Sequence, residues 1–110
     1  MRHFLPKTEI LRKRVDFGEI FRQGRRWEGK YFKLFCRASE RRMVGFAVGK
    51  KLGIAVVRNR MKRLMREIYR KHRRSIGKYQ IMMCAKVESV NKDIAILEKE
   101  FVRFMRILES

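Results

Sequence analysis

The chain has 110 residues, with 30 lysines and arginines against 11 aspartates and glutamates, and therefore a formal net charge of +19. This length suits one domain, and a hydrophobic fraction of 45% is enough to build a core despite the charge repulsion. No uncharged stretch approaches the roughly 20 apolar residues of a membrane span, and the start of the chain lacks the apolar core of a signal peptide. A positive surplus of this size favours a polyanion as partner, above all a nucleic acid, in the cytoplasm.

In chain order, hydrophobic periodicity predicts the element sequence αβββαβα. The expected elements are a helix within 8–23, a short strand around 27, strands over 31–38 and 43–49, a helix over 58–74, a strand over 79–86 and a helix ending near 108. Gly24 is expected to stop the first helix, and Ser89 or Asn91 to cap the last. The fold class is α+β in a single domain over residues 1–110, with residues 1–8 expected to be flexible.

The residue types that support catalysis or metal binding are sparse and scattered. Cys36 and Cys84 provide neither a disulfide framework nor the ligand spacing of a zinc site, and both fall in apolar, strand-like runs. We therefore expect buried, reduced thiols. No pattern of carboxylates, histidines and nucleophiles suggests general acid–base or covalent chemistry. The sequence predicts a protein without a catalytic residue or a metal site of its own.

Residues 50–74 form the electrostatic centre of the chain, with 11 basic side chains and one acidic side chain. A helix here separates an apolar arc from a basic arc. The apolar arc contains Met61, Leu64, Met65, Ile68 and His72, and the basic arc contains Asn59, Lys62, Arg63, Arg66, Arg70 and Arg73. Because Glu67 is the only acid available for pairing along the helix, phosphates are the expected partner of the basic arc. A merely solvated basic face is the alternative.

The run over residues 31–38 alternates like a strand with two different faces. One face carries Phe32, Leu34 and Cys36 toward a core, and the other carries Tyr31, Lys33, Phe35 and Arg37. Aromatic and basic side chains in one row are typical of surfaces that stack unpaired bases and hold the backbone. Alternatively, Tyr31 and Phe35 pack against a covering helix. Phe17 and Phe21, four residues apart, equally fit a core pair.

Two motifs resemble a known family. The run KKLGIAVVRNRMKRLMRE, residues 50–67, resembles the signature of the bacterial ribonuclease P protein component, approximately KK.G.AV.RNR.KR..RE. Upstream, Leu11, Asp16, Phe17, Phe21 and Gly24 fit its L....DF...F..G pattern, followed by the strand YFKLF. The resemblance covers about residues 8–105, and the segment before it has no clear counterpart.

The resemblance implies an α/β sandwich with a left-handed crossover around the RNR helix, and an accessory subunit of the endoribonuclease ribonuclease P. That subunit assists a catalytic RNA in removing the 5′ leader from precursor tRNA, with Mg²⁺ held mainly by the RNA. The residues implied to contact the catalytic RNA are Arg58, Asn59, Arg60, Lys62, Arg63, Arg66 and Arg70. A leader-binding cleft between the first helix and the sheet is expected to use Phe17, Phe21, Tyr31, Lys33, Phe35 and Lys51.

Two other functions remain open at this point. A structural RNA-binding protein of the ribosome would share the charge and the fold but would have no substrate cleft. A protein-only nuclease would need a carboxylate–metal centre, for which Asp16 and Glu19 are the only close pair outside the C-terminal helix.

Overall fold

The computed structural model describes residue 5, residues 7–11 and residues 14–109, with only the backbone described at 8, 14–17 and 109. Its helices and strands are α1 (Arg14–Gln23), β1 (Arg25–Glu28), β2 (Phe32–Ala38), β3 (Met43–Ala47), α2 (Ala55–His72), β4 (Tyr79–Ala85) and α3 (Ile94–Glu109). Short 3-10 turns lie at Lys7–Glu9, Lys50–Leu52, Arg73–Ser75 and Val87–Ser89. The predicted order αβββαβα and the α+β class are confirmed.

The four strands form one mixed sheet in the order β1-β2-β4-β3. β1 and β2 are antiparallel, as are β2 and β4, whereas β3 and β4 run parallel. Parallel neighbours need a crossover, and α2 supplies it between β3 and β4. The left hand of this crossover, which the family resemblance implies, stays a prediction.

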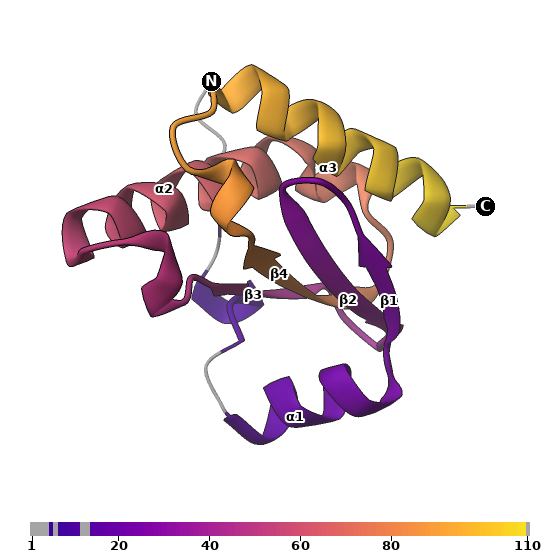
Figure 1. The fold of residues 1–110 in the computed structure, drawn as a ribbon. Helices are drawn as coiled ribbons and strands as arrows, with labels where there is room; N and C mark the ends of the chain where they lie inside the picture. The colour runs from indigo at the N-terminus through magenta and orange to yellow at the C-terminus, as the bar shows by residue number, and fades with distance from the viewer. Residues whose placement is uncertain (1–4, 6, 12–13, 110) are drawn as a thin grey trace.

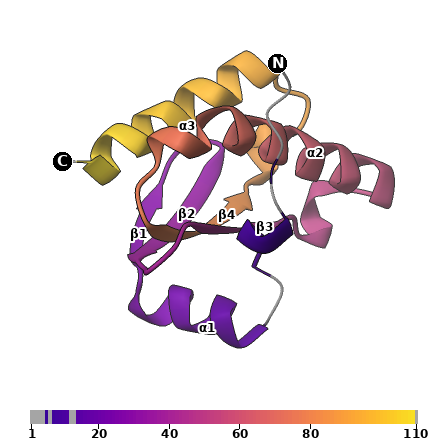
Figure 2. The same ribbon diagram turned by 180° about the vertical axis from the view of Figure 1, so that it is seen from behind.

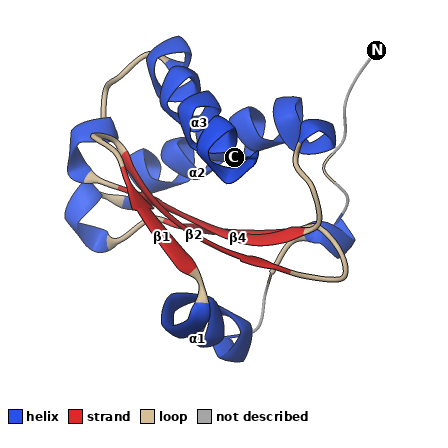
Figure 3. Cartoon of the chain, turned by 90° about the vertical axis from the view of Figure 1, so that its right-hand side faces the viewer, coloured by secondary structure: helices blue, strands red, loops and turns tan. Residues whose placement is uncertain are grey.

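The sheet separates two helical layers of unequal size. α2 and α3 cover one face and α1 covers the other (Figures 1, 2 and 3). The larger hydrophobic cluster lies beneath α2 and α3 and includes Phe32, Leu34, Val44, Met65 and Phe101. A smaller cluster lies on the α1 side: Leu11, Ile20 and Met82, with Phe35, Met43, Ala47 and Cys84 packed against it. The alternation predicted for Phe32, Leu34 and Cys36 is confirmed, since all three are buried.

The ends of two helices differ from the prediction. α2 begins at Ala55, three residues early. Its N-cap is Ile54, which follows Gly53, and few residues other than glycine adopt the φ of +135° found at Gly53. α3 begins at Ile94, so neither Ser89 nor Asn91 caps it. The Ser89 hydroxyl donates to the Lys86 carbonyl oxygen at 2.6 Å inside a 3-10 turn. Asn91 has a φ of 68° and so lies outside the helix. For Ser89, a competing local hydrogen bond therefore replaced the predicted cap.

The N-terminal segment is joined to the rest by Glu9. Its carboxylate accepts hydrogen bonds from the Arg73 Nε at 3.1 Å, the Tyr69 hydroxyl at 3.4 Å and an Arg42 guanidinium nitrogen at 3.4 Å. Arg73 thus lies beyond α2 in an ion pair, which corrects its predicted place on the basic arc. Within the segment expected to be flexible, Leu5 packs against the larger cluster and Lys7 begins a 3-10 turn.

Glu9 is expected to make the stability of the fold sensitive to acid. Burial alone would raise the pKa of Glu9, but the hydrogen bonds from Arg73 and Arg42 outweigh burial and hold the pKa below its ordinary value of 4.5. A depressed native pKa adds stability that is complete above the unfolded pKa and lost as the pH falls through the native pKa. Urea unfolding between pH 7 and pH 3 should show this loss.

The variant Glu9→Gln isolates this contribution. At pH 7 its unfolding free energy should be lower by about 1.5–3 kcal/mol, the usual worth of hydrogen bonds to a charged group. Below pH 4.5 the difference from the parent should shrink. Glu40→Gln, at an exposed carboxylate, is the matched control and should behave like the parent. Parallel pH profiles for the parent and Glu9→Gln would contradict the assignment.

Candidate nucleic-acid interface

The RNR helix, α2, has the two faces that its sequence predicted. Met61, Met65 and Ile68 are buried against the larger cluster. The exposed residues on the opposite side form what we call the α2 basic face: Asn59, Arg60, Lys62, Arg63 and Arg66. Arg58 and Arg70 flank this face and are half-buried. The helical period of 3.6 residues therefore places four positively charged side chains on one exposed surface: Arg60, Lys62, Arg63 and Arg66.

Among the described residues, no carboxylate pairs with the α2 basic face, because the nearby carboxylates are engaged elsewhere. The Glu67 carboxylate contacts Arg70, while Glu98 of α3 lies 3.7 Å from the Lys71 Nζ and 2.7 Å from the His72 Nε2. The neighbouring carboxylates are thus engaged at the C-terminal end of the helix. In the part of the chain that the structure describes, Arg60, Lys62, Arg63 and Arg66 make no ion pair or side-chain hydrogen bond. Their charge is available to an external anion.

The entry to α2 adds further positive charge. Lys50 and Lys51 are exposed in the 3-10 turn before Gly53. The first turn of the helix contains no acidic residue, and no side chain caps it. Free N–H groups and the helix dipole there favour a negative partner. The Nε of Arg58 is buried without a hydrogen-bond partner among the described residues.

Aromatic and basic side chains meet on the α1 side of the sheet. The rings of Phe21 and Phe35 lie edge to face, with centroids 4.7 Å apart. Phe21 nevertheless keeps 43% of its surface exposed. Lys33 and Phe35, two residues apart on β2, share this face by strand alternation and are both half-buried. The structure thus combines both sequence interpretations: Phe35 packs against α1, and Phe21 still offers an accessible ring.

Two residues expected in the leader-binding cleft, Tyr31 and Lys51, have no described contact with this pair. Tyr31 precedes the first residue of β2 and packs against the larger cluster, so the face predicted for it is wrong. Lys51 is exposed in the turn before α2, with no described contact to the aromatic pair. The side chain of Phe17 lies outside the described residues.

Two residues that sequence reasoning missed complete the α1 side. Met82 and Cys84 of β4 stand opposite Phe35 and Lys33 in the antiparallel register. They reach the α1 side only because β2 pairs with β4, which is distant in sequence, and no local sequence pattern predicts that pairing. Burial raises the pKa of Cys84 to about 11, which keeps the thiol neutral. Cys84 is half-buried and Cys36 is buried, and both are free, so complete burial was wrong for Cys84.

The pair of carboxylates considered for a nuclease is engaged elsewhere. Glu19 lies 3.1 Å from an Arg37 guanidinium nitrogen, which ties α1 to β2. The side chain of Asp16 is outside the described residues. None of the described helices is long and apolar enough to cross a bilayer.

Comparison with known proteins identifies the family. A family model described as "Ribonuclease P" matches residues 5–109. The chain belongs to the ribonuclease P protein family. Among curated ribonuclease P protein components, that of Natranaerobius thermophilus is 35% identical over 105 residues, covering 93% of this chain and 91% of the relative. That of Dictyoglomus turgidum is 48% identical over 73 residues, covering 64% of this chain and 61% of the relative.

The fold of this ribonuclease P family member agrees with a solved relative. The ribonuclease P protein from Thermotoga maritima superposes with a TM-score of 0.80 at 28% identity, covering 88% of this chain and 94% of that one. The two sequence motifs and the fold therefore support the same family.

Proposed function

We propose that this chain is the protein subunit of ribonuclease P and assists a catalytic RNA in removing the 5′ leader from precursor tRNA. The observation that carries the proposal is the α2 basic face, whose cations have no carboxylate partner among the described residues. Each would neutralise a phosphate of the catalytic RNA and release counterions, which dominates the affinity of basic proteins for nucleic acids. Arginine adds a planar fork that pairs with phosphate oxygens in bidentate fashion.

The α1 side of the sheet would receive the single-stranded leader. Phe21 offers an accessible ring beside Phe35, and Lys33 supplies positive charge from the same strand face. Aromatic stacking is tolerant of base identity and is worth roughly 1–3 kcal/mol per base. Such a surface suits a partner whose sequence varies from one tRNA precursor to the next. Because this surface lies across the sheet from α2, one protein can hold two RNA segments (Figure 3).

In this proposal, the catalytic RNA holds the magnesium ion. The ion supplies an activated water for hydrolysis of the phosphodiester. Within the described ranges, the protein gathers no three histidine, cysteine, aspartate or glutamate side chains able to hold a metal ion. The protein's own residues would bind and position the two RNAs.

Reconstitution tests the proposed function. The purified chain is combined with a bacterial ribonuclease P RNA, and processing of a leader-bearing precursor tRNA is measured at low magnesium. The chain should raise processing by that RNA and favour leader-bearing over mature tRNA. No effect on the RNA's activity would contradict the proposal. Cleavage by the chain without RNA would favour the protein-only nuclease instead.

The variant Phe21→Ala tests the leader surface in the same assay. Loss of one stacked ring should reduce the preference for leader-bearing over mature tRNA by about 10-fold, within the usual worth of base stacking. Phe21→Trp keeps an aromatic face and should retain the preference. Val87→Ala, another exposed apolar position, is the control for general surface effects. An unchanged preference in Phe21→Ala would remove Phe21 from the leader surface.

A further inference from the structure

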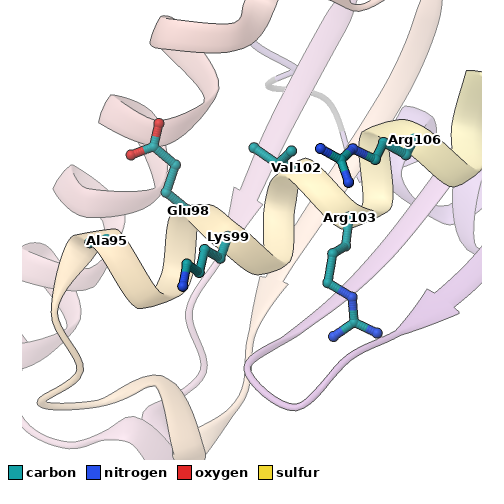
Figure 4. A pocket seen from close by; sticks show the side chains of 6 residues that line it. All are labelled: Ala95, Glu98, Lys99, Val102, Arg103 and Arg106. Atoms are coloured by element: carbon teal, nitrogen blue, oxygen red, sulfur yellow. The ribbon is translucent and has the colours of Figure 1, made fainter.

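The outer surface of α3 carries a groove that the proposed function does not use. It has a volume of about 410 Å³ and is lined entirely by this helix; we call it the α3 groove, and its residues are Ala95, Glu98, Lys99, Val102, Arg103 and Arg106. Their spacing follows one exposed stripe of the helix. Figure 4 shows the side chains along this stripe, with Glu98 directed toward α2.

The groove combines an apolar floor with a cationic rim. Ala95 and Val102 provide the floor, and three cations, Lys99, Arg103 and Arg106, provide the rim. Within the described part of the chain, no ion pair or side-chain hydrogen bond engages these three cations. Glu98, the one carboxylate among the lining residues, already interacts with Lys71 and His72 of α2. The local balance therefore favours an anion.

A buried contact holds the β1–β2 turn, which includes Lys30, against α3. The carboxylate of Glu100 accepts the backbone N–H of Lys30 at 2.6 Å, which fixes the β1–β2 turn against α3. The Lys30 side chain is exposed there. Arg103 extends from α3 toward the same turn (Figure 4). The turn that Arg103 approaches therefore carries an exposed cation of its own, Lys30, whose Nζ lies 5.7 Å from the ring centroid of Tyr31.

We propose that the α3 groove binds an unpaired segment of RNA, with phosphates held by Lys99, Arg103 and Arg106 and with successive bases lying over Ala95 and Val102. Guanidinium groups suit this ligand doubly, because they pair with phosphate oxygens and stack on bases. The inference rests on the proposed RNA-binding function but adds a surface separate from the α2 basic face and from the α1 side. A second copy of this chain fits poorly, since the rim would face a protein with the same net charge of +19.

A nuclear magnetic resonance titration of the isotope-labelled full chain with hexauridylate tests this groove. Backbone amide shifts report separately on residues 95–106 of α3 and on the α2 basic face. The α3 amides should shift and saturate. In the triple variant Lys99→Gln/Arg103→Gln/Arg106→Gln, the affinity reported by α3 should fall about 100-fold at 0.1 M salt, since each lost phosphate contact on a single strand contributes about 0.7 in the log–log salt slope.

Two further variants make the titration specific. Arg41→Gln/Arg74→Gln/Lys78→Gln removes the same charge from three exposed positions elsewhere and should leave the α3 affinity within about 5-fold of the parent, as expected for screened, distant charges. Ala95→Glu adds an acid to the first turn of α3, where the helix tolerates it. This variant should fold normally and lose the α3 shifts.

The outcomes separate this inference from the proposed function. Shifts on α2 without shifts on α3 would overturn the groove and leave the proposed function standing. No shifts on either helix would count against both. Shifts on α3 that depend on protein concentration without RNA would replace RNA with a second copy of the chain. Equal losses in the two triple variants would reduce the effect to net charge and overturn the groove.

Discussion

Replacing Arg60, Arg63 and Arg66 together with glutamine is expected to weaken binding of the catalytic RNA roughly 100- to 500-fold at 0.1 M salt. Each arginine is expected to contact one phosphate, and each such contact contributes about 0.7–0.9 to the slope of log affinity against log salt. These side chains are exposed and make no ion pair or side-chain hydrogen bond within the described residues. Their loss should therefore not harm the fold. Filter binding over a range of salt concentrations measures both the affinity and the slope.

The matched control again removes three exposed cations, by Arg41→Gln/Arg74→Gln/Lys78→Gln. It should weaken binding far less and leave the salt slope nearly unchanged, because general attraction is screened beyond about 10 Å at this salt concentration. The α2 variant should also melt at the same temperature as the parent or higher, since it relieves repulsion between neighbouring like charges on the helix. Equal losses in both triple variants would mean that the α2 basic face does not lie against RNA.

Replacing Glu100 with alanine is expected to lower the unfolding free energy by about 3 kcal/mol or more, because buried donors lose a charged acceptor. The carboxylate is buried and accepts backbone N–H groups from Lys30, Tyr31 and Phe32 at 2.6–3.1 Å. Gly29 completes this contact: a Cβ there would lie 2.4 Å from the carboxyl carbon of Glu100. The Glu100 carboxylate therefore anchors the β1–β2 turn to α3, alongside the hydrogen bond that the Lys86 Nζ donates to the Gly29 carbonyl oxygen at 3.0 Å.

Thermal and urea unfolding measure this loss, with a melting temperature lower by roughly 15 °C for a domain of this size. Glu88→Ala removes an exposed carboxylate and serves as the control for charge alone. Glu100→Gln keeps one acceptor oxygen and should fall between Glu100→Ala and the parent. A melting temperature of Glu100→Ala equal to that of Glu88→Ala would show that the turn does not depend on this carboxylate.

Local patterns predicted the elements around the candidate site well. The apolar arc of α2 and the buried side of β2 follow from periods of 3.6 and 2 residues, which depend on backbone geometry alone. Met61, Met65, Phe32 and Leu34 are accordingly buried where expected. The RNR motif pointed to the family for the same reason, since its residues are contiguous and need no tertiary information.

Contacts between distant segments could not be predicted in this way. Tyr31 was assigned to the wrong face because alternation was extended one residue beyond the start of β2. Arg73 was placed on the basic arc because its partner, Glu9, is 64 residues away. Glu100 and Phe32 are 68 residues apart in the sequence, and no local sequence pattern predicts their contact.

The amino-acid sequence by itself determined that a basic, amphipathic helix exists, that it carries the RNR motif and that the sheet has an apolar face. These properties depend on neighbours in the chain. The tertiary structure decided which cations stay unpaired, because a charge is neutralised by whatever acid the fold brings near it. It also decided that Phe21 meets Phe35 and that a cationic groove follows α3, since packing against the sheet selects which side of each helix remains exposed.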